Sequence, residues 1–370
     1  MRTGSNGAHR PAAAAPRGGM ISTATAPAPL PPRVTVIIPC LNEVRYISPC
    51  LDSICRQSYP RACMEVLVLD GGSTDGTLRA VERYAAQHAW IRLIPNPRRI
   101  AATALNIGIR SAGGDVIARM DAHCEYPPQY LERLVAALLE TGADNVGACV
   151  ATLPANQSAR ARGLAAAQAH PLGVGSSWFR IGVREPRWVD TVPFGCYRRE
   201  VFRRIGLFDE ALVRNQDDEL NHRLIRHGGK ILLVPDATVR YYSRGTYHQV
   251  ARMYYQYGYY KPLAARKIGA VMTLRQLTPA AFLAAVCAGV LLSPLWSAAG
   301  AATLALAGGY AAAVVGVALQ AAPTRGAGAA LAMAAALPVL HFSYGWGYLR
   351  GLWNLLVARR PFAATAALSR

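Results

Sequence analysis

The stretch VTVIIPCLNE, residues 34–43, decides the fold of this chain. Its first six residues are β-branched or apolar, which is typical of a strand buried on both faces, and a polar loop follows directly. The same order recurs at residues 65–76, where EVLVLD leads into GGSTDG, and at residues 115–125. Helices are expected between such strands, for example over residues 101–112. This alternation predicts an α/β fold with a mostly parallel sheet flanked by helices.

The net charge of +19 lies mainly at the two ends of the 370-residue chain. Residues 34–236 hold all 21 acidic and 24 basic residues, whereas residues 237–370 hold 12 basic residues and no acidic one. A nucleic-acid-binding domain concentrates basic charge on the fold itself, so we expect no nucleic acid as a partner. The eight cysteines lack paired metal-site spacing and are interpreted as reduced cytoplasmic thiols.

The C-terminal quarter is apolar enough to lie in a membrane. No charged residue occurs between Arg275 and Arg325, and the run from Gly326 to Leu349 is also uncharged. About 20 apolar residues are enough to cross a bilayer core. We therefore predict three transmembrane segments, near residues 279–297, 300–320 and 327–349.

The charges that flank these segments predict their orientation. Those before Arg275 put the preceding domain in the cytoplasm, so we expect a multi-pass protein of the bacterial inner membrane. Three spans then place Arg350 outside, against the positive-inside tendency. Either the third segment is re-entrant or interfacial, with Pro338 and His341 breaking it, or the tendency does not hold here. Both alternatives stay open.

These features divide the chain into five expected parts. They are a disordered tail rich in Pro and Ala (1–32), a catalytic domain (33–240), basic and aromatic interface helices (241–276), about three transmembrane segments (277–350) and a basic tail (351–370). The interface helices are expected because eight tyrosines between Tyr241 and Tyr260 alternate with basic residues just before the membrane segments. The basic stretch 252–275 is expected to face anionic lipid headgroups.

Polar residues gather where the predicted strands end. Ligands of such sheets bind outside the carboxyl ends of the strands, which places residues 39–43, 70–75 and 121–125 along one crevice. Strand alternation would point Asp121 and His123 to the same side. A carboxylate with an imidazole suits Mg²⁺ or Mn²⁺, with diphosphate oxygens completing the shell. A capped strand end with a satisfied histidine is the alternative interpretation.

Two further groups near this crevice suit a nucleoside diphosphate. Asp70 ends a strand, where a carboxylate can accept a hydrogen bond from a nucleobase N–H, although GGSTDG is also an ordinary tight turn. The guanidinium groups of Arg98 and Arg99 suit a diphosphate, or they form a solvated surface pair. Asn106 follows them in Asn-Ile-Gly.

The segment QDDE, residues 216–219, opens a predicted helix that ends at Gly228. Acidic residues in a first turn are favoured by the helix dipole, so simple capping is one interpretation. Three successive carboxyl groups are more than capping requires. Their repulsion raises at least one pKa, which suits a general base.

Together these motifs resemble those of inverting family 2 glycosyltransferases. The motifs are VTVIIPCLNE (34–43), LDGGSTDGT (69–77), Asn106-Ile107-Gly108, Asp121-Ala122-His123 and QDDELNHRL (216–224). The resemblance covers about residues 33–262. Within the family, MDAH (120–123), VDTVPFG (189–195) and QYGY (256–259) are similar to the ExoA group of succinoglycan biosynthesis proteins.

The resemblance implies a GT-A nucleotide-sugar-binding fold and roles for individual residues. Pro39, Asn42, Glu43 and Asp70 would line the uracil and ribose pocket, and Arg99, Asn106 and Asp121 would complete the nucleotide-sugar site. Asp121 and His123 would stand at the D-x-D metal site, with His123 where many members have Asp. Asp217 would be the catalytic base, with Asp218 as its rival, and Gly195 and Gln256 would lie on the acceptor side.

The expected reaction is a single displacement that inverts the anomeric centre. A UDP-sugar, by resemblance UDP-glucose, would donate a hexose with the help of Mg²⁺ or Mn²⁺. A membrane-bound enzyme is expected when the acceptor is carried by a lipid, so we expect a polyprenyl-diphosphate-linked saccharide and a role in exopolysaccharide or cell-surface glycan assembly. The alternatives are a processive polysaccharide synthase, whose Q-x-x-R-W pattern is absent, and a non-catalytic sugar-nucleotide-binding membrane protein.

Overall fold

A computed structural model describes residues 30–270 and 273–362 of the chain. The chain divides into two units, Met1–Pro31 and Pro32–Arg370, and all helices and strands described below belong to the second. Nearly all of the tail expected over 1–32, and residues 363–370 of the basic tail expected over 351–370, lie outside the described residues.

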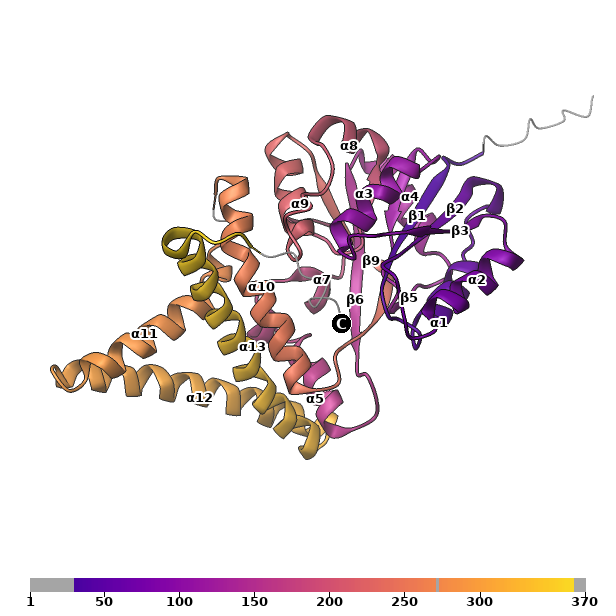
Figure 1. Ribbon diagram of the computed structural model, residues 1–370. Coiled ribbons are helices and arrows are strands. Elements are labelled where there is room, and N and C mark those ends of the chain that lie inside the picture. Colours follow the sequence, from indigo (N-terminus) through magenta and orange to yellow (C-terminus); the bar gives the residue numbers. More distant parts are fainter. Residues whose placement is uncertain (1–29, 271–272, 363–370) are drawn as a thin grey trace, which may run out of the picture. The chain divides into compact units, whose positions relative to one another are not determined.

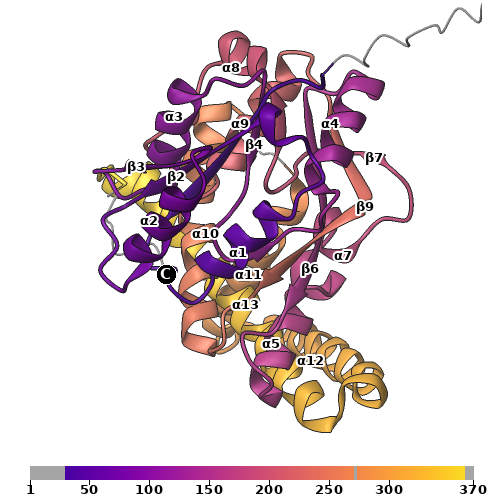
Figure 2. The ribbon, with the colours of Figure 1, turned by 90° about the vertical axis from the view of Figure 1, so that its right-hand side faces the viewer.

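The second unit is built on one mixed sheet of nine strands (Figures 1 and 2). Eight of them follow the order β3-β2-β1-β4-β8-β6-β9-β5, and β7 pairs with β9. The strands are β1 (Val34–Cys40), β2 (Met64–Asp70), β3 (Ile91–Pro95), β4 (Val116–Arg119), β5 (Cys124–Glu125), β6 (Asn145–Leu153), β7 (Arg187–Trp188), β8 (Cys196–Arg198) and β9 (Ile231–Tyr242). The expected parallel core is confirmed for β3, β2, β1 and β4, and β6 and β9 are also parallel. Strands β5, β7 and β8 pair antiparallel.

Helices cover both faces of this sheet. The helices of the sheet region are α1 (Ile47–Cys55), α2 (Thr77–Gln87), α3 (Ala101–Ser111), α4 (Tyr130–Thr141), α5 (Ala159–Ala167), α6 (Pro171–Val174), α7 (Trp178–Ile181), α8 (Arg199–Ile205) and α9 (Gln216–Arg226). Val36 and Ile38 of β1 pack into a core with α1, α2 and α4, whereas Ile37 packs into a second core with α3, α8 and α9. Strand β1 is therefore buried on both faces, as its apolar run predicts.

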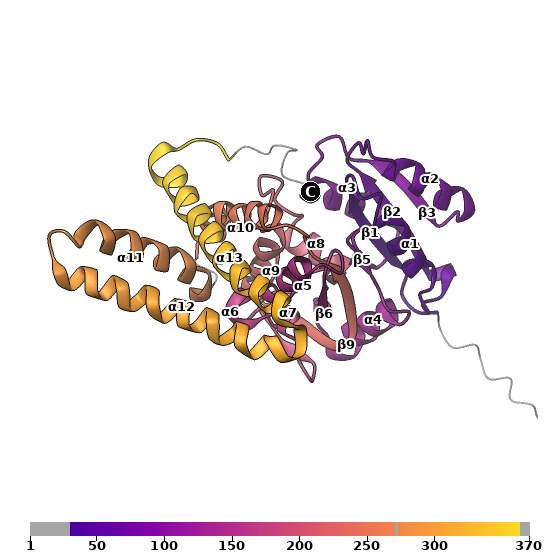
Figure 3. The same cartoon turned by 90° about the horizontal axis from the view of Figure 1, so that it is seen from below.

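The C-terminal region consists of four longer helices. They are α10 (Tyr247–Ile268), α11 (Thr278–Leu292), α12 (Ser297–Arg325) and α13 (Ala327–Trp353), with short helical turns at Arg61–Cys63, Leu274–Gln276 and Asn354–Ala358 elsewhere in the chain. Figures 1 and 3 show α11 and α12 running side by side, with α13 in contact with both and with α10. Two helices among the described residues are long and apolar enough to cross a membrane. They are α12 and the continuous helix Ala327–Ala358, which consists of α13 and the turn that follows it.

One expectation about the membrane segments needs correction. The segment predicted at 279–297 is a helix of only 15 residues that ends at Leu292, just before Ser293-Pro294. This helix is shorter than the roughly 20 residues of a simple span. Of the two alternatives for the third segment, a break at Pro338 and His341 is wrong, since α13 continues through both residues.

Helix α10 is in backbone contact with α13. Gly258 of α10 lies against the carbonyl oxygen of Tyr344, and Gly347 and Gly351 of α13 lie against carbonyl oxygens of α10. A Cβ atom at any of these three positions would collide with the facing backbone. The two helices therefore form one rigid pair, in the manner of small-residue contacts between membrane helices.

Candidate active site

Arg119 stands at the centre of the polar side chains, at the end of β4. Its Nε and Nη2 atoms donate to the two carboxylate oxygens of Asp121, at 2.9 and 3.2 Å, and its Nη1 atom donates to Asp217 Oδ1. The Arg119 side chain is 10% exposed. Burial alone would favour its neutral form, but the two carboxylates raise the pKa of Arg119, so it stays protonated. One buried cation thus joins the acid that follows β4 to the acid that opens α9.

Asp217 and Asp218 share the first turn of α9 but differ in environment. Asp217 is 30% exposed, its Oδ2 atom accepts no hydrogen bond within the described residues, and burial raises its pKa against the opposing effect of Arg119. Asp218 accepts a hydrogen bond from Lys261 Nζ at 2.5 Å and one from Thr191 Oγ1 at 3.3 Å. Burial opposes its ionisation, but Lys261 lowers the pKa of Asp218. Asp217 thus keeps one carboxylate oxygen without a hydrogen bond within the described residues, whereas Asp218 is paired with Lys261, and the choice between the two as catalytic base stays a prediction.

Helix α10 holds the turn that leads into α9. Asn215, whose φ is 63°, donates from its side-chain amide to the Tyr257 carbonyl oxygen at 3.0 Å. Arg214 Nε donates to Gln256 Oε1 at 3.1 Å, so the buried Gln256 supports this turn. Gly195 supports the site from the other side, because its carbonyl oxygen accepts a hydrogen bond from the Arg119 backbone N–H.

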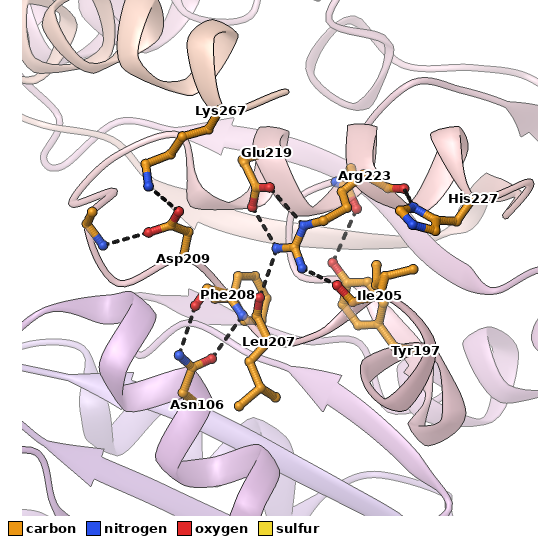
Figure 4. Close-up of polar contacts among 12 residues, drawn as sticks. Asn106, Tyr197, Ile205, Leu207, Phe208, Asp209, Glu219, Arg223, His227 and Lys267 are labelled. Carbon is orange, nitrogen blue, oxygen red and sulfur yellow. Dashed lines mark hydrogen bonds and ion pairs between the residues drawn. The ribbon is translucent and has the colours of Figure 1, made fainter. Parts of the chain in front are cut away.

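Three cations of the basic stretch 252–275 face acids of the catalytic domain, so the expectation of contact with lipid headgroups is wrong for these three. Lys261 pairs with Asp218, Lys267 with Asp209 at 2.5 Å and Arg275 with Asp190 at 2.8 Å. Figure 4 shows Lys267 pointing from α10 toward Asp209. These ion pairs join α10 and the segment after it to the loops around α9.

The loops after β1 and β2 are tied together by the residues predicted to hold a nucleotide. Asp70 accepts hydrogen bonds from the Gly72 and Ser73 backbone N–H groups and from Ser73 Oγ, at 2.5 to 3.0 Å. Asn42, at φ 54°, accepts from the Thr74 N–H at 2.9 Å. Pro39 lies in β1 opposite Leu69. The tight-turn interpretation therefore describes these contacts, and nucleotide binding by the same residues stays a prediction.

Asp121 and His123 lie beyond the end of β4, so strand alternation does not orient them as expected. Arg119 orients Asp121, and Glu43 Oε1 lies 3.3 Å from His123 Nδ1. A carboxylate that holds the second nitrogen of an imidazole is the usual support of a metal-ligating histidine. No cluster of three or more ligating side chains exists among the described residues. Both carboxylate oxygens of Asp121 accept from Arg119, so cation binding by Asp121 and His123 stays a prediction and would require a bound diphosphate to supply further ligands.

Asn106 has a structural role, in place of the predicted nucleotide contact. It is 2% exposed, its Nδ2 atom donates to the Phe208 carbonyl oxygen and to Glu210 Oε1, and its Oδ1 atom accepts from the Phe208 N–H, all at 2.9 to 3.0 Å (Figure 4). These bonds attach α3 to the loop before α9. Next to it, Gly108 allows α3 to approach β1, since an added Cβ would lie 2.5 Å from Ile37 Cγ2.

Asn106→Ala is expected to lower the free energy of unfolding by about 1–3 kcal/mol, because three hydrogen bonds are lost and buried partners are left unpaired. Thermal unfolding of the purified protein measures this change. Ser111→Ala, an exposed site at the end of the same helix, is the matched control and should have almost no effect. Equal stability of the two variants would contradict the structural role.

Arg99 lies near the loop after β2, and its contact with a diphosphate stays a prediction. It is exposed, has a φ of 61°, makes no ion pair within the described residues, and its Cα lies beside Gly71. Its neighbour Arg98 pairs instead with Glu210 at 2.6 Å. The adjacent residues Arg98 and Arg99 thus differ in their contacts, because only Arg98 forms an ion pair within the described residues.

Two residues of the site were missed in the sequence. Arg119 has a visible signal, because it is the only charged residue in the apolar strand VIAR and charges seldom occur in buried strands. Lys261 has no such signal, since its ion pair with Asp218 joins residues that are 43 positions apart.

Comparison with known proteins agrees with this geometry. A family model described as "Glycosyl transferase family 2" matches residues 35–206. The succinoglycan biosynthesis protein ExoA of Rhizobium meliloti (strain 1021) is 34% identical over 260 residues, which are 70% of this chain and 77% of that protein. The dolichyl N-acetyl-alpha-D-glucosaminyl phosphate 3-beta-D-2,3-diacetamido-2,3-dideoxy-beta-D-glucuronosyltransferase of Methanococcus voltae is 31% identical over 244 residues, covering 63% and 74% of the two chains.

A solved structure is similar over most of the chain. The mannosyltransferase PcManGT from Pyrobaculum calidifontis, in complex with GDP-Man and Mn²⁺, superposes with a TM-score of 0.53 over 88% of each chain at 24% identity. The mixed sheet with flanking helices is that of the GT-A glycosyltransferases. The family model and the sequence relatives show that the chain belongs to glycosyl transferase family 2.

Proposed function

We propose that this protein is a membrane-bound inverting hexosyltransferase. Its donor would be a UDP-sugar, with glucose as the transferred hexose, and its acceptor a polyprenyl-diphosphate-linked saccharide in exopolysaccharide or cell-surface glycan assembly. The observation that carries the proposal is the pair of unlike carboxylates on α9, in which Asp218 is neutralised by Lys261 and Asp217 keeps one unpaired oxygen.

The proposed step is one in-line displacement. Asp217 Oδ2 takes the proton of an acceptor hydroxyl while that oxygen bonds to the sugar C1, and the bond from C1 to the diphosphate oxygen breaks. Arg119 keeps Asp217 ionised and oriented. A single displacement without a covalent glycosyl intermediate inverts the anomeric centre, so an α-linked donor gives a β-glycoside.

Asp121 and His123 would hold a divalent cation together with the donor diphosphate. When bound, Mg²⁺ or Mn²⁺ stabilises the charge of the departing nucleoside diphosphate. Arg119 and Glu43 hold the two side chains in place from the protein side. The relative PcManGT, solved with GDP-Man and Mn²⁺, supports the use of a cation by this fold.

Asp121→Asn is expected to remove most of the metal-dependent part of UDP binding, because a neutral amide is a weak ligand for a hard cation. UDP binding is titrated by calorimetry with Mn²⁺ and with a chelator. Asp52→Asn, on α1, is the matched control of equal charge change. If the variant and the wild type show the same metal dependence, the Asp121–His123 site is wrong.

The membrane part of the proposal rests on exposed apolar surface. Leu304, Val315 and Leu319 of α12 are each more than half exposed, which is expected of a helix that lipid covers. The Methanococcus relative is named for action on a dolichyl-phosphate-linked sugar, which supports a lipid-linked acceptor. The proposed location is the bacterial inner membrane, with the catalytic domain in the cytoplasm.

A direct test is to incubate membranes containing the protein with labelled UDP-sugars and a panel of lipid-linked acceptors. The proposal expects one labelled lipid, extended by a single β-linked hexose. Product analysis by mass spectrometry and NMR gives the number of added sugars and the anomeric configuration. A long polymer would instead indicate a processive synthase, and an α-glycoside would exclude single displacement.

A further inference from the structure

A cavity of about 360 Å³ lies where β1, β6 and β9 lead into α1, α5 and α10. Arg119 and Asp217 do not line it, whereas Asn42 and Glu43, which are predicted to contact the nucleotide, lie in its wall. Its walls come from three loops that are distant in the sequence, at residues 42–46, 155–160 and 243–249. The cavity therefore opens at the same sheet edge as the active site, but on the side of the C-terminal helices.

Each of these three loops contributes one arginine to the cavity. They are Arg45, Arg160 and Arg244. Arg160 is fixed in orientation, since its Nε atom donates to the Gly245 carbonyl oxygen at 3.2 Å. Three guanidinium groups that converge from separate segments indicate an anionic ligand, and phosphate is the anion that guanidinium binds best through paired hydrogen bonds.

The two acidic residues of the cavity wall, Asp75 and Glu43, offset only part of this charge, because three arginines face them. Asp75 accepts hydrogen bonds from the Val44 N–H and from the Thr77 N–H and hydroxyl, at 2.5 to 3.1 Å. Glu43 lies 3.3 Å from His123. The net charge of the lining stays positive.

Ser243 gives a second, independent sign of a ligand. It lines the cavity, it is 2% exposed, and its Oγ atom has no hydrogen-bond partner within the described residues. A buried hydroxyl normally has a partner. A phosphate oxygen in the cavity would accept its hydrogen bond.

The position of the cavity indicates where such a phosphate comes from. Helix α5, which begins beside it, packs on α13, since a Cβ at Gly163 would lie 2.5 Å from Ala332 Cβ. The Tyr247 hydroxyl at the start of α10 donates to the Ala332 carbonyl oxygen at 3.0 Å. The cavity is thus attached to a helix that is long and apolar enough to cross a membrane.

We propose that this cavity binds the phosphate or diphosphate headgroup of a membrane lipid. One source of the headgroup is the polyprenyl diphosphate of the acceptor, and in this respect the proposal rests on the proposed function. The other source is an anionic phospholipid of the bilayer. Lys261, Lys267 and Arg275 are paired with acids of the catalytic domain, so the arginines of this cavity are the cations that we assign to the headgroup.

The test measures lipid binding to the full-length protein in detergent, by the thermal stabilisation that each added lipid produces. Polyprenyl diphosphate, phosphatidylglycerol and phosphatidylcholine are compared, and UDP serves as a probe of the donor site. The variants are Arg160→Ala with Arg244→Ala, and Ser243→Ala alone. Arg83→Ala, an exposed arginine of α2, is the matched control for loss of charge.

The double arginine variant is expected to bind the phosphate-bearing lipid at least about tenfold more weakly, since two charge-assisted hydrogen bonds are lost. Ser243→Ala should weaken binding less, and Arg83→Ala not at all. UDP binding should be unchanged in every variant. The lipid whose affinity falls identifies the source of the headgroup.

Two results would overturn the proposal: unchanged affinity for both anionic lipids, or weaker UDP binding in the double arginine variant, which would assign the cavity to the donor. If the proposed function is wrong, activity and lipid binding give a different combination of results. A protein without transferase activity that still binds phosphatidylglycerol through Arg160 and Arg244 would contradict the function and leave the headgroup site standing.

Discussion

Asp217→Asn is expected to lower the rate of sugar transfer by about a hundredfold to ten-thousandfold, the usual contribution of a general base. The amide keeps the size of the side chain and its hydrogen bond from Arg119, but it cannot take a proton. Binding of the UDP-sugar should stay close to that of the wild type, because Asp217 is proposed to act on the acceptor. Transfer is measured with saturating donor, and UDP binding by calorimetry.

Asp218→Asn is the matched control for this prediction, since it changes the neighbouring carboxylate on the same turn of α9. It should lose less activity than Asp217→Asn, because Asp218 is already occupied by Lys261 and Thr191, but it also lowers stability by leaving the buried Lys261 unpaired. If Asp218→Asn abolishes transfer and Asp217→Asn does not, the roles of the two carboxylates are reversed.

The pH dependence of transfer follows from the same environment. Burial raises the pKa of Asp217, and the base acts only when ionised. The rate should therefore rise with pH through this raised pKa and be lost below it, at a higher pH than for an ordinary aspartate. Asp217→Asn should remove this acidic limb from the pH profile.

Much of the sheet could be predicted because each strand carries its own signal. The run VTVIIP predicts a strand buried on both faces, and the structure buries Ile37 in one core and Val36 and Ile38 in the other. Strand β8 was not predicted, since it has three residues and its place between β4 and β6 depends on pairing with segments far away in the sequence. Short local runs do not encode such long-range pairs.

The site could be predicted only where residue type and position determine the environment. Asp121 follows a strand end and Asp217 opens a helix, so the sequence alone predicts acids at the crevice. Asn106 shows the limit of this reasoning, because its partners lie on a loop 102 residues further along the chain. A polar residue next to an expected crevice can equally well satisfy the backbone of another segment.

Lys261 joins the C-terminal helices to the helix turn that holds the proposed base. Its side chain is 7% exposed and its Nζ atom lies 2.5 Å from Asp218, the residue after the proposed base. It belongs to α10, which is in backbone contact with α13 through Gly258. The first turn of α9, which holds Asp217 and Asp218, is thus joined through Lys261 to a helix pair that includes a candidate membrane helix.

Lys261→Met is expected to destabilise the protein by about 3 kcal/mol, near the lower end for a broken buried ion pair because Asp218 is a quarter exposed. Transfer should fall with it, since an unpaired Asp218 repels Asp217 and releases α9 from α10. Adding Asp218→Asn removes the uncompensated charge, so the double variant should recover stability and part of the activity.

Lys267→Met is the matched control on the same helix. Its pair with Asp209 is about one-third exposed, so its loss should cost at most about 1 kcal/mol. Thermal unfolding and transfer rates of the four proteins measure these differences. Equal effects of the two lysine variants, or no recovery in the double variant, would show that the Lys261–Asp218 pair does not position the base.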